Sequence, residues 1–203
     1  MKKVITVLFA LMFVLSVAYA DDNATAKKPE AEKKEAHQKG KASNPEVAIE
    51  TDFGTMKLEL FRDVAPAHVD SMISRVKEKF YDGLIFHRII PNFMIQGGDP
   101  KGTGTGNAGY TLPAEFSKLN HIKGTLSMAR AQDPNSASCQ FFICLVPTPH
   151  LDNQYTIFGQ LMEGYDVLDK IGAVKTGPRD KPLEDVFIRK MYMIDDSKGE
   201  EKK

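Results

Sequence analysis

Residues Phe86 to Asp99 form the stretch FHRIIPNFMIQGGD. It begins as an apolar run long enough for a buried strand, yet the always-charged side chain of Arg88 lies within that run. A buried cation without a partner is costly, so Arg88 either pairs with a carboxylate or extends its guanidinium into a cleft. Pro91 has no N–H to give to a strand ladder, and Gly97 and Gly98 permit backbone angles that a side chain forbids. The chain beyond the arginine is therefore expected to turn sharply.

Segments typical of strands lie on both sides of this stretch. Apolar residues at helical spacing predict one helix that begins near Pro66 and ends before Gly83, and a second helix that ends at Gly172. Many strands and two helices predict a mainly β fold, a closed antiparallel β-barrel with helical caps. The expected strands are a hairpin at 47–51 and 55–60, followed by 125–128, 140–145, 155–161 and 186–194.

Two further blocks narrow the prediction to a family. Residues 124–131 are GTLSMARA, and residues 138–143 are SCQFFI. Together with residues 86–99, they closely resemble the two signature segments of the cyclophilins, the cyclosporin-type peptidyl-prolyl cis-trans isomerases, in the right order and at the expected distance. The resemblance covers residues 45–194 and implies a closed eight-stranded antiparallel β-barrel with a helix at each end. It also implies an enzyme that rotates X–Pro bonds and assists protein folding.

Composition sets limits on domains and partners. The chain has 203 residues, 42% of them hydrophobic, which is enough for one good core once the ends are set aside. We therefore expect one domain, and the resemblance implies that it is an isomerase domain at residues 45–194. The 27 basic and 27 acidic residues cancel to a formal net charge of zero, so neither nucleic acid nor an anionic membrane is an expected partner. We expect a monomer that binds proline-containing unfolded or extended polypeptides.

The first 20 residues have the layout of a signal peptide. Lys2 and Lys3 precede an apolar run, and the small residues of 18–20 favour cleavage after Ala20. An uncleaved membrane anchor is the alternative, because the apolar run is nearly long enough to span a bilayer. The two lysines and the lack of an ER-retention tail favour a bacterial periplasm over a eukaryotic secretory lumen. After cleavage, no attachment to the membrane is expected.

The rest of the chain outside the domain is charged. Residues 21–44 contain no large apolar side chain and are expected to form a disordered spacer, and residues 195–203 are a charged tail. Asn23 lies in an Asn-Ala-Thr acceptor triplet, but such triplets are common by chance and we favour an unmodified asparagine. Inside the domain, Cys139 and Cys144 would lie roughly 16 Å apart on one strand, too far to form a disulfide. We expect buried free thiols.

The reaction implied by the resemblance has a barrier of ~18–20 kcal/mol that comes from amide resonance. A guanidinium beside the prolyl nitrogen can donate to the lone pair that appears there when the amide twists, an interaction absent from the planar ground state. Arg88 is the expected donor, and lysine would be a poorer substitute because it lacks the rigid fork of N–H groups. No cofactor is required. The five histidines show no close metal-ligand spacing, so no metal site is expected.

The resemblance places further residues around Arg88. By this resemblance, a dry slot for the proline ring is formed by Phe93, Met94, Phe142 and Leu151, and Ala129 lies at the neighbouring subsite. The polar side chains of Gln96 and Gln140 hold the peptide and Arg88. The backbone of Arg130 contacts the residue before proline. Phe93, Gln96 and Gln140 are assigned to catalysis together with Arg88, and the others to substrate binding.

Two positions depart from the familiar eukaryotic pattern. His150 stands where a tryptophan usually lines the pocket rim, and Tyr155 stands where a histidine usually follows the Leu-Asp turn; both are assigned to substrate binding. Loss of the indole removes apolar surface and an N–H donor, so cyclosporin binding is expected to be weak while isomerase activity is kept.

Blander interpretations remain open at this point. Taken singly, the apolar site residues are more often core than pocket, and an arginine in a strand is more often simply paired. A proline-peptide binding module or holdase chaperone would keep the pocket but have little use for the guanidinium of Arg88. A purely structural barrel would have no cleft chemistry. The joint occurrence of these residues in two signatures favours the isomerase.

Overall fold

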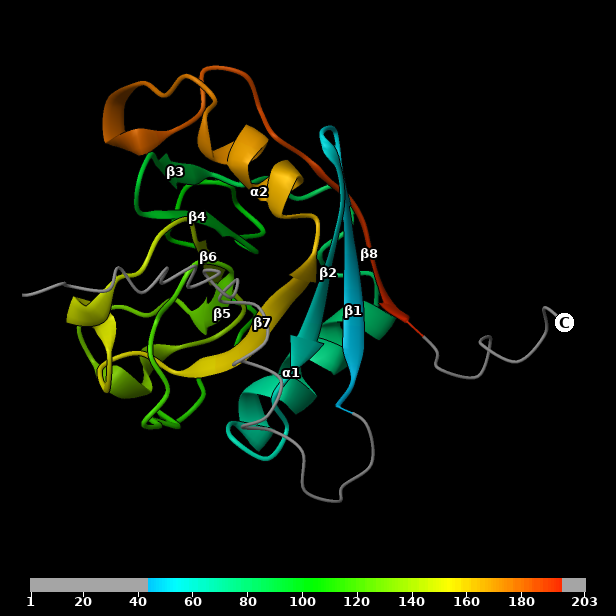
Figure 1. Cartoon of the computed structure of the whole chain (residues 1–203). Coiled ribbons are helices and arrows are strands. Elements are labelled where there is room, and N and C mark those ends of the chain that lie inside the picture. The colour runs from blue at the N-terminus through cyan, green and yellow to red at the C-terminus, as the bar shows by residue number, and fades with distance from the viewer. Residues whose placement is uncertain (1–43, 195–203) are drawn as a thin grey trace, which may run out of the picture. The chain divides into compact units, whose positions relative to one another are not determined.

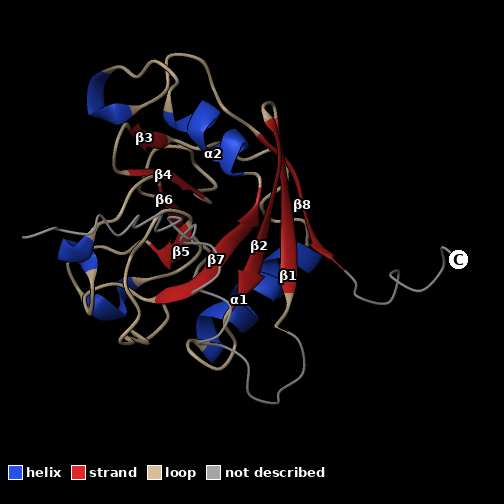
Figure 2. Ribbon diagram, viewed as in Figure 1, coloured by secondary structure: helices blue, strands red, loops and turns tan. Residues whose placement is uncertain are grey.

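The computed structural model describes residues 44–194, which form a strongly curved antiparallel sheet with one α-helix at each end (Figures 1 and 2). The predicted signal peptide, almost all of the predicted spacer, Asn23 and the charged tail lie outside the described residues. The elements are β1 (Glu46–Thr51), β2 (Gly54–Leu60), α1 (Pro66–Lys77), β3 (Arg88–Ile90), β4 (Met94–Gly97), β5 (Thr125–Met128), β6 (Phe141–Cys144), β7 (Ile157–Glu163), α2 (Tyr165–Gly172) and β8 (Ile188–Ile194), with short 3-10 helices η1 (Pro134–Ser136), η2 (Pro149–Leu151) and η3 (Pro178–Asp180).

The eight strands follow the order β3-β4-β6-β5-β7-β2-β1-β8, and each neighbouring pair is antiparallel. The closed barrel predicted from the sequence is wrong in this respect, because no ladder joins the outer strands β3 and β8. These edges meet where the segment before β3 reaches the start of β8: Ile85 bridges Phe187, the Phe86 N–H donates to the Val186 carbonyl at 2.9 Å, and the Ile188 N–H donates to the Leu84 carbonyl at 2.8 Å. The cause is local: β3 is three residues long and ends at Ile90, directly before Pro91, which cannot donate to a ladder.

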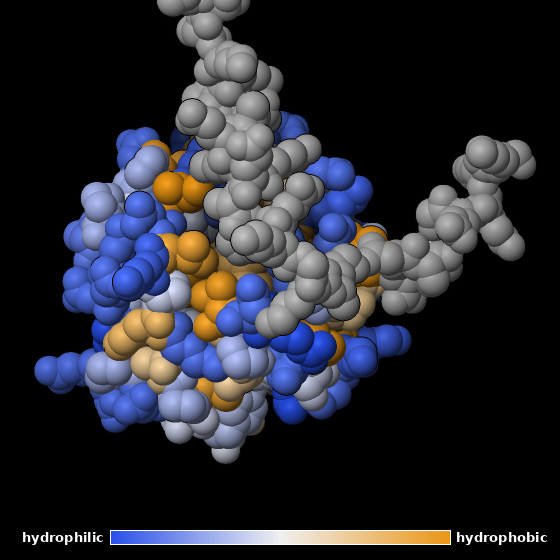
Figure 3. All heavy atoms as spheres, turned by 60° about the horizontal axis from the view of Figure 1, so that its bottom comes forward, coloured by the Kyte–Doolittle hydropathy of each residue, from blue (hydrophilic) through white to orange (hydrophobic). Residues whose placement is uncertain are grey.

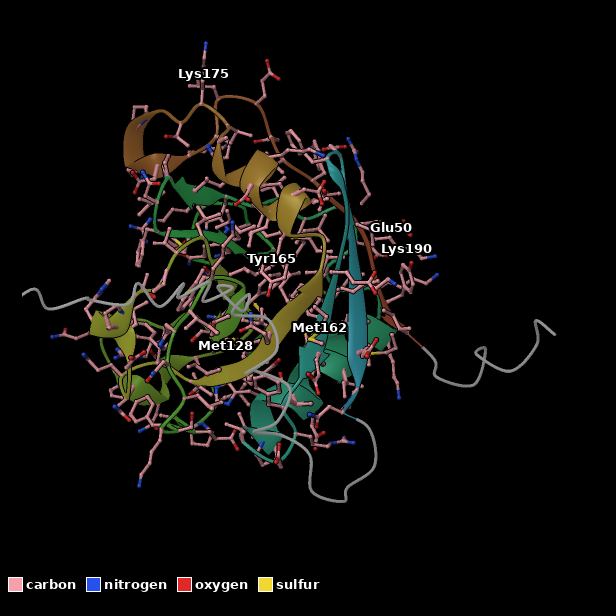
Figure 4. All side chains as sticks on the ribbon, in the orientation of Figure 1. Glu50, Met128, Met162, Tyr165, Lys175 and Lys190 are labelled. Carbon is pink, nitrogen blue, oxygen red and sulfur yellow. The ribbon has the colours of Figure 1, made fainter. Side chains whose placement is uncertain are left out.

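The hairpin of β1 and β2 shows how alternation builds the core. Val47 and Ile49 on β1, with Met56 and Leu58 on β2, are fully buried, and the small Ala48 between the first two is buried as well, whereas the polar Lys57 of β2 is partly exposed. On the outer face, Glu50 and Lys190 lie opposite each other across β1 and β8 (Figure 4). Such cross-strand pairs of opposite charge add modestly to sheet stability.

The two helices close the ends of the sheet with their apolar faces. Helix α1 begins at Pro66 and buries Val69, Met72 and Val76 in the main core. It ends earlier than the apolar spacing extends, because Lys79 adopts a positive φ of 57° and directs Phe80 into edge contact with Tyr81. Helix α2 follows a left-handed Gly164 and ends at Gly172, as predicted.

The surface mixes polar and apolar residues. On the face shown in Figure 3, hydrophobic groups lie between hydrophilic ones. No helix within residues 44–194 has the length and apolar character needed to cross a bilayer.

Candidate active site

The stretch from Arg88 to Gly97 builds two different environments on the two faces of the sheet. One row of cross-strand partners runs from Ile89 through Ile95 and Ile143 to Leu126, and all four side chains are buried in the main core. Because side chains alternate along a strand, the neighbouring row points to the opposite face. That row consists of Arg88, Gln96, Phe142 and Ser127.

The second face carries its own apolar cluster, separate from the main core. Met94, Phe142, Cys144 and Leu151 are buried in it, and Ile90, Phe93, Ala129 and Tyr155 pack against it while staying partly accessible. A cavity of about 210 Å³ opens over this cluster. The side chains of this second cluster therefore form the floor of a pocket and are not part of the main core. The pocket lining is Arg88, Phe93, Met94, Gln96, Ala129, Arg130, Phe142, Leu151 and Tyr155.

Nine of the eleven predicted site residues thus line one cavity. The other two contact residues of its lining: Gln140 accepts a hydrogen bond from Gln96, and the ring of His150 is tilted over Phe93 with centroids 5.5 Å apart. The structure brings all eleven together, and the role assigned to each stays a prediction.

Arg88 both extends into a cleft and pairs with a carboxylate, the two alternatives that the sequence left open. It lines the pocket, and its Nε donates to Oδ2 of Asp180 at 3.2 Å. The side chains of Arg88 and Asp180 are 43% and 44% exposed, so the pair is solvated and the guanidinium is reachable from the cleft. Asp180 lies 92 residues along the chain, and sequence analysis did not find it.

The two glutamines form a relay to a surface loop. Gln96 Nε2 donates to Gln140 Oε1 at 2.9 Å, and Gln140 Nε2 donates to the Gly106 carbonyl at 2.8 Å. That loop is organised by the buried carboxylate of Asp99, which accepts from the backbone N–H of Lys101 at 2.8 Å. Burial alone would raise the pKa of Asp99, but the backbone donors of the loop outweigh it and hold the pKa below its ordinary value. Gln96 is the cross-strand partner of Arg88, yet the hydrogen bond of Arg88 runs to Asp180 instead.

Arg130 uses its side chain to hold the pocket wall. Its Nη2 donates to the Gln154 carbonyl at 2.9 Å, and the guanidinium carbon lies 4.4 Å from the centre of the Tyr155 ring. Tyr155 in turn meets Phe142 edge to face, with centroids 5.8 Å apart. Tyr155 is therefore a packed residue of the pocket wall.

A buried histidine supports the pocket floor from behind. His121 stacks on Phe142 with centroids 6.0 Å apart and an interplanar angle of 9°. Its Nδ1 pairs with Asp152 at 2.9 Å and its Nε2 with the Ser127 hydroxyl at 3.0 Å. Burial lowers the pKa of His121, although Asp152 acts in the opposite direction. Both His121 and Ser127 are almost completely buried, so the arrangement supports Phe142 and offers no accessible nucleophile. No local sequence pattern connects these residues.

A larger hollow of about 410 Å³ lies elsewhere, between the β1–β2 turn and the segment 174–186. It contains none of the predicted site residues. Within residues 44–194, no cluster of three or more His, Cys, Asp or Glu side chains is arranged to hold a metal ion.

Comparison with known proteins agrees with this geometry. The family model described as "Cyclophilin type peptidyl-prolyl cis-trans isomerase/CLD" matches residues 46–193. The chain belongs to the cyclophilin family. This cyclophilin is 44% identical over 153 residues to peptidyl-prolyl cis-trans isomerase ppi1 of Schizosaccharomyces pombe, covering 73% of this chain and 98% of the relative. It is 47% identical over 131 residues to a peptidyl-prolyl cis-trans isomerase of Synechococcus elongatus, covering 64% of this chain and 89% of the relative.

Solved structures show the same likeness. A cyclophilin-type isomerase of Cryptosporidium parvum superposes with a TM-score of 0.72 at 33% identity, covering 75% of this chain and 98% of that one. A second structure of that protein, obtained in the presence of the dipeptide Ala-Pro, gives a TM-score of 0.71 at 33% identity, covering 74% of this chain and 99% of that one. This cyclophilin is therefore an enzyme, a peptidyl-prolyl cis-trans isomerase.

Proposed function

We propose that the pocket binds the proline of an extended or unfolded polypeptide and that Arg88 stabilises the twisted X–Pro amide. The proline ring lies on Phe142 and Met94, and the guanidinium donates to the prolyl nitrogen as its lone pair emerges. Because this bond is made only in the twisted state, it lowers the barrier rather than merely tightening binding. No proton, nucleophile or metal takes part in this step.

The observation that carries the proposal is the row of Arg88, Gln96 and Phe142 on one sheet face. It sets a charged fork of N–H donors beside an apolar slot at a fixed spacing. A related cyclophilin was crystallised in the presence of Ala-Pro, which supports a proline-containing peptide as the substrate.

The required stabilisation is moderate. Uncatalysed isomerisation takes ~10–100 s, and millisecond turnover needs an acceleration of about 10⁴–10⁵, or roughly 5.5–7 kcal/mol. A charge-assisted hydrogen bond in a partly dehydrated cleft, together with fixed orientation of the peptide, is of sufficient size.

The test is an NMR exchange assay of an Ala-Pro peptide with residues 21–203. We expect Arg88→Ala to lower kcat/KM by about 10²-fold or more, the size typical for loss of one transition-state donor. Arg88→Lys should restore only a small part, because an ammonium is compact and strongly hydrated. Arg62→Ala is the matched control, since Arg62 pairs with Asp70 on the surface and does not line the pocket. Full activity of a folded Arg88→Ala variant that still binds peptide would refute the role of the guanidinium.

We also propose that the enzyme acts in a bacterial periplasm as a monomeric folding factor. Support comes from the sequence of residues 1–20 and from the neutral formal charge. Expression of the full chain in a bacterium, followed by cell fractionation and N-terminal sequencing, tests this. Periplasmic protein that begins at Asp21 supports the proposal, and retention of Met1 in the membrane fraction supports the anchor instead.

A further inference from the structure

Asp180 is the partner of Arg88 within the described residues. Nε of Arg88 lies 3.2 Å from Oδ2 of Asp180, and this contact is both a hydrogen bond and an ion pair. Within residues 44–194 it is the side-chain hydrogen bond that Arg88 makes. A guanidinium carries five N–H donors in one plane. A bond at Nε therefore fixes that plane while leaving the terminal nitrogens without a partner among the described residues.

The backbone around Asp180 presents its carboxylate from an unusual turn. Arg179 and Asp180 adopt positive φ angles of 62° and 59°, in the left-handed region that residues other than glycine seldom occupy. The turn is closed by a 2.7 Å hydrogen bond from the Gly177 N–H to the Lys181 carbonyl and by a bridge between Thr176 and Pro182. In Figure 1, this segment, coloured orange, lies beside β3. The carboxylate is thus held next to the strand that carries Arg88.

We propose that Asp180 is a positioning residue that orients the guanidinium of Arg88 towards the twisted amide. The proposal rests on the catalytic assignment of Arg88. An arginine side chain has many rotamers, and one that is 43% exposed is not confined by packing alone. The bond at Nε selects the rotamers in which the terminal N–H groups face the pocket. Asp180 itself does not line the pocket.

A carboxylate beside a catalytic cation has an opposing effect as well. It reduces the net positive potential at the prolyl nitrogen and could hold the guanidinium back from the peptide. Because both side chains are about half exposed, solvent screens this Coulomb effect strongly. Solvent does not screen the orientation of the guanidinium, so orientation is the larger of the two effects. Loss of the Asp180 carboxylate is therefore expected to slow the enzyme.

Three variants test the proposal. Asp180→Gly removes the carboxylate and suits the positive φ, and Asp180→Asn keeps an oxygen acceptor, tolerates this backbone and removes the charge. Asp185→Asn is the matched control: Asp185 lies in the same loop with a 45% exposed side chain, and it pairs with Lys181 at 3.6 Å rather than with Arg88.

We expect Asp180→Gly to lower kcat by about two- to five-fold with little change in KM, as fits an exposed ion pair. Asp180→Asn should lose less, and Asp185→Asn nothing.

A double-mutant cycle separates positioning from a merely structural role. In the Arg88→Ala background, NMR exchange measures the residual rate, and there Asp180→Gly should have no further effect. The side-chain ¹H–¹⁵N resonance of Arg88 Nε should broaden or shift in Asp180→Gly and stay in place in Asp185→Asn. An equal loss in both backgrounds, an unchanged kcat or a faster enzyme would overturn the proposal. If Arg88→Ala itself keeps full activity, the assignment of Arg88 fails first, and the two failures are distinguishable.

Discussion

His150 lies at the pocket rim with its ring tilted over Phe93, at a centroid distance of 5.5 Å. An imidazole covers less apolar surface than an indole and offers a polar edge in its place. The rim therefore remains aromatic, so a short proline peptide still meets a ring beside Phe93. A large cyclic apolar ligand, in contrast, loses a substantial part of the surface on which it would lie.

Cyclosporin inhibition should therefore depend on this single residue. We predict weak inhibition of the native chain and an inhibition constant lower by about tenfold or more in His150→Trp, because the indole adds buried apolar area and a donor. Titration of inhibitor in the Ala-Pro exchange assay measures both. The uninhibited kcat/KM of His150→Trp serves as the control and should stay within about two-fold of the native value. Equal inhibition constants for the two proteins would contradict the prediction.

The sequence predicts which residues line the pocket better than it predicts the contacts that support them. Eight of the eleven predicted site residues lie inside the two signatures, which carry them as local strings, whereas His150, Leu151 and Tyr155 lie beyond residue 143 and were placed by the resemblance alone. Asp180 and His121 were not found. Asp180 pairs with Arg88, which lies 92 residues away in the chain, and His121 stacks on Phe142. A single acidic or imidazole side chain in a loop carries no periodicity that would reveal such contacts.

At the scale of elements, the segment after β4 connects the pocket to the Asp99 loop through Gly98. This glycine has a φ of +84°, and a Cβ there would lie 2.5 Å from the Cys139 carbonyl oxygen. The close approach keeps β4 next to the segment that leads into β6. The glycine pair predicted to permit unusual backbone angles thus does so at its second member.

Replacement of Gly98 should destabilise the fold by more than the strain of its left-handed backbone angle alone. We predict that Gly98→Ala lowers the free energy of unfolding by about 2–4 kcal/mol, from left-handed strain and a steric clash. Gly109→Ala is the matched control, because Gly109 has the same φ of +84° with no atom within 4 Å of the added Cβ. Its cost should be only about 1 kcal/mol. Urea unfolding of both variants measures the difference, and equal losses would show that the clash is relieved by relaxation.

The elements themselves show where sequence patterns suffice and where they fail. The β1–β2 hairpin was predicted almost to its ends, because buried and partly exposed residues alternate along most of β2 and only the small Ala48 interrupts the pattern in β1. The stretch from Arg88 onward has apolar side chains on both faces, so alternation cannot show that it is two strands. The turn between β3 and β4 depends on a left-handed Asn92 with φ 59°, which the sequence analysis did not identify.

For the domain as a whole, three buried histidines couple folding to pH. His68, His87 and His121 are at most 5% exposed, and burial lowers the pKa of each below its ordinary value. Below about pH 6.5, the unfolded chain binds protons at these positions that the folded chain does not. The stability of the domain therefore falls as the pH drops from about 6.5 towards the lowered folded pKa values.

We predict that the urea midpoint is higher at pH 7.5 than at pH 5.5. His87→Leu should reduce this difference, because neither ring nitrogen of His87 has a partner among the described residues and leucine has no proton to bind. His150→Gln is the comparison variant, because it removes an exposed imidazole rather than a buried one, and it should reduce the difference less than His87→Leu does. Chemical denaturation at both pH values measures the effect. A midpoint that rises on acidification would contradict the prediction.

The sheet also conceals both thiols of the chain. Cys139 and Cys144 are free and buried, as predicted, and burial raises the pKa of Cys144 to about 11. A thiol is alkylated as its thiolate, so iodoacetamide should react only with molecules in which the segment 139–144 has come open. The rate of labelling would then follow the opening of the pocket floor itself, without any dye or engineered probe. The same concealment means that the folded enzyme keeps both thiols away from the cysteines of other proteins without the help of a reductant.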